Sequence, residues 1–105
     1  LPMHDAQGVA RTIVFAGAMA LLDSQGDTRA AFYVDAADGS PRMTMSDAQG
    51  DTRAQLAVLT NGNPSLLMSD AQGNQRVGLH VGPDGSPMMG LLEAQGEGRA
   101  HLGWA

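Results

Sequence analysis

Acidic and basic side chains that recur at a fixed spacing are the residues of this chain most able to do chemistry. Five times an acidic residue, a small residue, Gln and Gly follow one another, and an Arg stands three residues after each Gly. The acids are Asp5, Asp23, Asp47, Asp70 and Glu93, and the arginines are Arg11, Arg29, Arg53, Arg76 and Arg99. A ladder of such pairs could recognise a repeating polar ligand such as a glycan.

The same pairs have a structural interpretation. Asp at the first position of a turn accepts hydrogen bonds from later backbone N–H groups, and Gly at the last position adopts a positive φ without a steric penalty. Arg would lie over the strand and pair with an acid of its own or the next repeat, a contact that contributes about 0–1 kcal/mol when exposed. We favour this interpretation, because repeat proteins keep such residues for turn geometry alone.

Histidines and further acids are weaker candidates for metal binding. His80 and His101 fall on the same strand face in successive repeats, and His4 is the third histidine. A three-fold axis could bring imidazoles together around a metal, yet no Cys or carboxylate stands at ligand spacing. Asp35 and Asp38 come closest to a calcium site, but the run Asp-x-Asp-x-Asp-Gly is absent. We therefore expect no metal and no cofactor.

Catalytic and nucleic-acid-binding functions are disfavoured. The sequence has no nucleophile elbow, no phosphate loop and no paired acid and base, so we expect no catalytic residues and no enzyme activity. A net charge of -5 and a pI near 4.8 would repel nucleic acid. Cysteine is absent, which excludes disulfides and thiolate metal sites.

Two kinds of turn divide the chain into five hairpin repeats. The acidic turns begin 18, 24, 23 and 23 residues apart, and a fixed period of this size indicates a repeat architecture. The second turn signal comprises Asp38-Gly39-Ser40-Pro41, Asn61-Gly62-Asn63-Pro64 and Asp84-Gly85-Ser86-Pro87. We expect a single domain over 1–105 with repeats at about 1–17, 18–40, 41–63, 64–86 and 87–105.

The segments between the turns alternate apolar and polar residues with period two, which is typical of strands. No segment between Gly and Pro is long enough for an amphipathic helix. Thr12 to Leu22 is too short to span a membrane, and we interpret it as two strands joined at Gly17. Pairing parity predicts an even loop at Asp47 to Gly50 and odd loops at the Pro-containing connectors. The sequence predicts an all-β antiparallel meander of about ten short strands.

One face of this meander would be rich in methionine. Met3, Met19, Met43, Met45, Met68 and Met89 share it, and only Met88 falls on the other face. A single layer with one apolar face is not stable alone in water. We expect it to pack against copies of itself as a homotrimeric β-prism; the alternative is a monomeric barrel or sandwich.

The second face differs between the two ends of the chain. Near the N-terminus it carries Ile13, Phe15, Leu22 and Tyr33, and further on it becomes small and mostly polar, with Leu67 and Leu92 as exceptions. We expect the N-terminal third to be covered on both sides, by an upstream segment or a neighbouring chain. Trp104 is in register with core positions, so we expect it to cap the last layer rather than to stack on a sugar.

The repeat resembles a known class of sequences. The pattern Asp-x-x-Gly-x-x-Arg-Ala-x-Leu-x-Val, followed by Asp-Gly-x-Pro-x-Leu-x-Met, is similar to uncharacterised bacterial β-hairpin repeat proteins and covers essentially the whole chain except Gly8 to Leu22. The architecture is similar in style to the β-shafts of phage fibres and injection-system spikes. The resemblance implies a repetitive β architecture and transfers no catalytic motif.

The expected function is therefore structural. We expect a rigid oligomeric module that serves as shaft, spacer or display surface, with an extracellular or particle-surface location favoured. The alternative is a carbohydrate-binding module that uses the repeated turn residues, and the partner could also be another protein. Residue 1 is Leu rather than Met, so we further expect chain upstream of Leu1.

Overall fold

The computed structural model describes residues 2–93 in full and the backbone of residues 98–103. The described part consists of ten strands and contains no helix. The strands are β1 (Pro2–His4), β2 (Ala10–Phe15), β3 (Ala18–Leu22), β4 (Thr28–Val34), β5 (Pro41–Ser46), β6 (Thr52–Val58), β7 (Pro64–Ser69), β8 (Gln75–Val81), β9 (Pro87–Leu92) and β10 (Gly98–Gly103). The side chains of Arg99 and His101, and all of Trp104, lie outside the described residues, so the expected cap by Trp104 stays a prediction.

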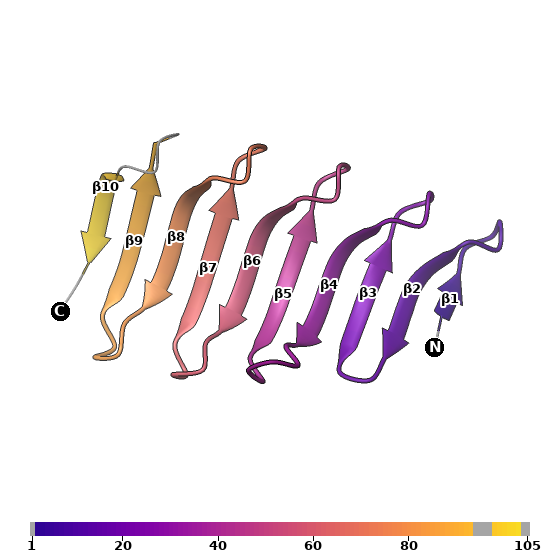
Figure 1. The fold of residues 1–105 in the computed structure, drawn as a ribbon, viewed down its shortest axis with the longest axis horizontal. Helices are drawn as coiled ribbons and strands as arrows, with labels where there is room; N and C mark the ends of the chain where they lie inside the picture. The colour runs from indigo at the N-terminus through magenta and orange to yellow at the C-terminus, as the bar shows by residue number, and fades with distance from the viewer. Residues whose placement is uncertain (1, 94–97, 104–105) are drawn as a thin grey trace.

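The strands form one antiparallel sheet in which each strand pairs with its neighbours in sequence (Figure 1). This confirms the predicted all-β meander of hairpins. The strands run across the long axis of the molecule, and β1 and β10 lie at its two ends (Figure 1). The described strands form one open sheet, so the alternative of a monomeric barrel or sandwich is wrong for this structure.

The turns gather on two edges of the sheet. The Arg edge carries the Asp-x-Gln-Gly turns, which precede the even-numbered strands, and the Pro edge carries the remaining connectors (Figure 1). At the Arg edge, Gly50 N donates to Asp47 O at 3.0 Å, as in a type I turn, and Gly50 has φ +87°. Asp47 N donates to Asp51 O, so only three residues stand inside the turn.

A bulge next to this turn accounts for the strand register. Ser46 pairs with Thr52 while Met45 pairs with Ala54, so Arg53 is the extra residue. The predicted parity of Met45 and Ala54 is confirmed, but a three-residue turn plus a bulge produces it, not a four-residue loop. The same shift recurs in the other repeats, where the extra residues are Arg11, Arg29, Arg76 and Arg99.

The Pro edge differs from the prediction at one connector. The connectors between Val58 and Pro64 and between Val81 and Pro87 hold five residues each, and their odd length is confirmed. The connector between Val34 and Pro41 holds six, so an odd loop was wrong there. The extra residue explains why the acidic turns at Asp23 and Asp47 begin 24 rather than 23 residues apart.

The register aligns the side chains of one face into three rows across the strands, which we call together the methionine face. The Arg-side row is Met3, Thr12, Leu21, Ala30, Met45, Ala54, Met68, Val77 and Leu91. The central row is Val14, Met19, Phe32, Met43, Leu56, Leu66, Leu79 and Met89. The Pro-side row is Val34, Pro41, Val58, Pro64, Val81 and Pro87.

No described residue of the chain covers the methionine face. The radius of gyration is 16.3 Å, against about 13 Å for a compact domain of this length. The accessible surface is 6908 Å², whereas a compact monomer of 10.9 kDa exposes about 5,600 Å². Ala57, which is 3 % exposed, is the only apolar side chain that the described part buries. The chain is therefore a single layer without a core of its own. No helix of the described part is long and apolar enough to cross a membrane.

Candidate functional site

The recurring Asp of each Arg-edge turn holds the turn closed. Oδ1 of Asp5 accepts hydrogen bonds from the backbone N–H groups of Gln7 and Val9, both at 3.0 Å. Asp23, Asp47 and Asp70 accept the equivalent pairs at 2.9–3.1 Å. Hydrogen bonds to the charged form favour ionisation. One carboxylate oxygen in each turn is therefore committed to the backbone.

These hydrogen bonds change the acidity of the turn residues. The pKa of Asp5 lies below its ordinary value, chiefly because the N–H of Val9 donates to the carboxylate. The pKa values of Asp47 and Asp70 are lowered in the same way, by the N–H groups of Asp51 and Asn74 respectively. Arg11, Arg53 and Arg76 contribute smaller lowering effects. The carboxylates are therefore stabilised as anions inside their own turns.

The bulged Arg links one repeat to the next. Arg53 Nε donates to the carbonyl oxygen of Ser69, at the end of the following repeat's first strand, at 2.7 Å. Its Nη1 lies 3.5 Å from Oδ2 of Asp47 in its own turn. The planar guanidinium presents donors in two directions at once, which a Lys ammonium on a flexible stem does not do. This geometry favours Arg over Lys at this position of the repeat.

The other described arginines of the ladder repeat this geometry. Their Nε atoms donate to the carbonyl oxygens of Leu22, Ser46 and Leu92 at 2.8, 3.0 and 2.6 Å, and their Nη1 atoms lie 3.4, 3.8 and 3.5 Å from Asp5, Asp23 and Asp70. The acid–Arg pairs therefore act as staples between successive hairpins. This geometry supports the structural interpretation of the ladder over glycan recognition.

A second polar cluster stabilises the six-residue connector of the Pro edge. Ser40 is buried, and its backbone N and its Oγ both donate to Oδ1 of Asp38, at 2.9 and 2.7 Å. The hydroxyl hydrogen bond of Ser40 is the main reason that the pKa of Asp38 is lowered. Arg42 Nη2 lies 3.3 Å from Oδ2 of Asp38, and its Nε lies 3.6 Å from Oδ2 of Asp35. The two acids considered for calcium thus share an arginine.

The histidines do not form a cluster in the structure. His80 and His101 lie on the same face by register, as predicted, but His80 pairs with Met88 whereas His101 pairs with Gly90. They therefore lie in different rows across the sheet. His4 is in β1, at the far end of the sheet. Among the described residues no group of three or more His, Cys, Asp or Glu could hold a metal ion.

The methionine face is the candidate site that these observations leave. Of the fifteen large apolar side chains that the described part exposes, all except Phe15 and Leu59 lie on this face. Phe32 is 51 % exposed and Met45 is 55 % exposed. None of its three rows contains a charged residue, and Thr12 is its one polar side chain. Such a continuous apolar surface marks an interaction site.

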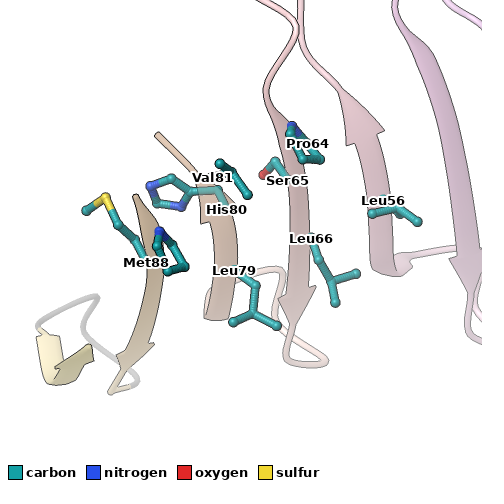
Figure 2. Close-up of a pocket in the computed structure, with 9 residues that line it drawn as sticks. Leu56, Pro64, Ser65, Leu66, Leu79, His80, Val81 and Met88 are labelled. Carbon is teal, nitrogen blue, oxygen red and sulfur yellow. The ribbon is translucent and has the colours of Figure 1, made fainter. Parts of the chain in front are cut away.

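Shallow hollows run along this face. One of about 290 Å³ lies across β6 to β9, and Figure 2 shows Leu56, Leu66 and Leu79 projecting from three successive strands beside it. Two more, of about 200 and 180 Å³, lie over β4 to β6 and over β3 to β5. Residues of the methionine face such as Leu56, Leu79 and Met43 line these hollows, together with residues of the opposite face such as His80, Arg42 and Ala31.

A separate groove lies at the first hairpin. It has a volume of about 700 Å³, Phe15 and Tyr33 line it, and its floor includes Ala18, Ala20 and Ala31. These residues belong to the face opposite the methionine face, where the sequence predicts an apolar N-terminal third. The placement of these side chains is confirmed, and the segment expected to cover them stays a prediction.

Comparison with known proteins gives no further guide to the site. No protein-family model matches the chain, and no curated protein matches its sequence. The similarity to bacterial β-hairpin repeat proteins therefore enters only the proposal below.

Proposed function

We propose that this chain is a structural and interaction module, a rigid β-hairpin repeat that assembles with copies of itself into a shaft, spacer or display surface. The uncovered methionine face is the observation that carries the proposal. A one-layer sheet with an exposed apolar face lacks the second layer that a stable domain requires. Further copies of the chain supply that layer with a surface of the same chemistry.

The size of the face suits this role. The molecule is 51 Å long, and a strand of six residues spans about 20 Å, so the flat area of the face is roughly 1,000 Å². A stable complex buries about 800 Å² on each partner. The methionine face is therefore large enough to hold an assembly together.

The proposed assembly is a homotrimeric β-prism with one chain on each side. Uniform repeats that contact only their neighbours build an elongated object and favour a symmetric oligomer. Methionine is unbranched and flexible, which suits layers of side chains that meet around an axis. The resemblance to bacterial repeat proteins and to fibre or spike shafts supports the same role at an extracellular or particle surface.

The polar residues support a structural role more than a binding or catalytic one. Asp47 directs one carboxylate oxygen to its own turn and the other to Arg53, and Arg53 also donates to the next repeat. A carbohydrate-binding module would need these groups to be available to a sugar. The proposal assigns the chain no catalytic role.

Absolute molar mass in solution tests the proposal, measured by light scattering coupled to size exclusion. We expect about three times the chain mass of 10.9 kDa. The mass should stay the same in high salt, because the contact is apolar and salt does not weaken it. A particle of one chain mass would overturn the proposal.

A further inference from the structure

The shape of the methionine face specifies how neighbouring chains meet. Its central row carries the largest side chains of the even-numbered strands, such as Phe32, Leu56 and Leu79. In the same three strands the Arg-side row carries only Ala or Val, and the Pro-side row carries only Val. The Pro-side row is therefore lower than the midline, whereas the Arg-side row alternates: it carries Ala or Val in these strands and Leu21, Met45, Met68 and Leu91 in the odd-numbered strands.

The width of the face suits one side of a triangular prism. A side of about 20 Å lies about 6 Å from a three-fold axis, close to half of the roughly 10 Å between packed sheets. The room over each side is greatest at the midline and vanishes at the corners. Two sheets packed face to face would offer uniform height, and four sheets would lie about 10 Å from their axis and leave a hollow. The width of the face, together with a Pro-side row lower than the midline, therefore favours three chains.

The symmetry then determines which rows meet. Three identical chains related by a closed three-fold axis run in the same direction and stand at the same level. At every corner the Arg edge of one chain lies beside the Pro edge of the next, because each chain has one of each. The Arg-side row of one chain thus faces the Pro-side row of its neighbour, strand by strand.

Where the Arg-side row of one chain meets the Pro-side row of the next, the residues of the same strand are complementary in size. The pairs across a corner would be Ala30 with Val34, Met45 with Pro41, Ala54 with Val58, Met68 with Pro64, Val77 with Val81, and Leu91 with Pro87. In four of these six pairs the small Ala faces the branched Val or the long Met faces the flat ring of Pro. A shift by one strand would set Ala against Pro and Met against Val, which gives alternate gaps and clashes.

We infer that the binding partner of the Arg-side row is the Pro-side row of a second copy at the same level, and that the three central rows meet at the axis. This inference rests on the proposed trimer. It names specific contacts, such as Ala54 with Val58 of the next chain, that a trimer of another arrangement would not make.

Engineered cysteines test these contacts, because the chain has no Cys of its own. The double variant Ala54→Cys/Val58→Cys, treated with copper–phenanthroline, should give a covalent trimer on a non-reducing denaturing gel. Both residues lie in β6, four positions apart, which is too far for a disulfide within the chain. Ala30→Cys/Val34→Cys in β4 should behave in the same way and replaces the first variant if that one does not fold.

Two controls separate register from mere proximity. Ala30→Cys/Val58→Cys combines residues two strands apart, about 10 Å in level, and should give no covalent trimer. Gln55→Cys, on the opposite face, should give no crosslink. The mass of each reduced variant is measured first.

The outcomes distinguish the inference from the function on which it rests. A covalent trimer from the equal-level pairs alone supports the inference. A solution trimer in which these pairs do not crosslink, or in which the offset pair does, overturns the inference and leaves the proposed function standing. If both the variant and the wild-type chain are monomeric, the proposed function is overturned. If the equal-level pairs give a covalent dimer with the mass of two chains, the three-fold arrangement is overturned.

Discussion

The first hairpin and the interior hairpins of this sheet differ in both length and surface. Between β2 and β3 the sheet ends at the pair of Phe15 and Ala18, and only Ala16 and Gly17 connect them. Between β6 and β7 the pairing continues to Val58 and Pro64, followed by a five-residue connector. The first hairpin thus lacks the outermost pair of the Pro-side row and three connector residues. These five residues account for the distance of 18 rather than 23 residues between the turns at Asp5 and Asp23.

The face opposite the methionine face also differs in composition between the first hairpin and the interior hairpins. The interior repeats carry polar residues such as Thr44, Gln55 and Ser65 on the face opposite the methionine face. At the first hairpin that face carries Phe15, which is 58 % exposed, and Tyr33, and a groove opens there. A regular repeat is therefore built for contact on one face, whereas the first hairpin presents apolar surface on both.

Placing a charge on the central row should have the largest effect and should differ between the two regions. In the proposed trimer, Leu56→Asp would bring three carboxylates to the axis, and the desolvation cost of several kcal/mol per ion should dissociate the assembly to monomers. Val14→Asp in the first hairpin lies where the Pro-side pair is missing, so water reaches it and the loss should be smaller. Light scattering over a dilution series measures both.

Gln55→Asp is the matched control for this charge, since Gln55 neighbours Leu56 on the opposite face. It should leave the mass unchanged. Equal dissociation by Leu56→Asp and Gln55→Asp would mean that net charge, and not the methionine face, controls assembly.

Replacement of a turn glycine should have the next largest effect, a fall in the melting temperature. Gly50 has φ +87°, and a Cβ added there would have nothing within 4 Å, so Gly50→Val meets backbone strain and no clash. The left-handed conformation costs an L residue about 1–2 kcal/mol, and more when it is β-branched. The melting temperature should fall by several degrees, and Gly50→Asn should fall less because Asn tolerates this conformation. An unchanged melting temperature for Gly50→Val would contradict the turn geometry.

Removal of one ladder Arg should lower the free energy of unfolding by less than the glycine replacement does. The loss should be similar in the first hairpin and in the interior. Arg53→Ala loses the hydrogen bond to Ser69 and the ion pair with Asp47, at a cost of about 1 kcal/mol for partly exposed groups. Arg11→Ala loses the equivalent contacts to Leu22 and Asp5. Urea unfolding of both variants measures the loss, and Arg53→Lys should recover only part of it. A much larger loss at Arg53 alone would mean that the staple also takes part in assembly.

Much of the fold could be predicted from the sequence, because turns and alternation are local. The strand faces, the Met-rich row pattern and the Asp-closed turns follow from period two and from Gly and Asp at fixed offsets. The bulge at Arg53 could not be predicted, since pairing parity alone is satisfied by either an even loop or an odd loop with one extra residue. The recurrence of Arg three residues after Gly was the signal, but its target is a carbonyl oxygen such as that of Ser69, which no sequence pattern marks.

Acid should weaken both regions equally, and this is the smallest of the expected effects. Hydrogen bonds from Val9 and Asp51 lower the pKa values of Asp5 and Asp47 below the ordinary value of 3.8, so both folded-state values are depressed. The stabilisation is therefore fully present above the unfolded-state pKa and is lost as the pH falls through the folded-state values. Thermal unfolding measured from pH 7 down to pH 2 should show it.

The single variants Asp5→Asn and Asp47→Asn keep an acceptor oxygen for the turn but cannot titrate. Each should reduce the loss of melting temperature in acid, and by similar amounts, because the Arg edge is the same in the first hairpin and in the interior. An effect at Asp47 alone would mean that the first turn opens independently of the array. The difference between the two regions would then extend to the Arg edge, although the hydrogen bonds there are alike.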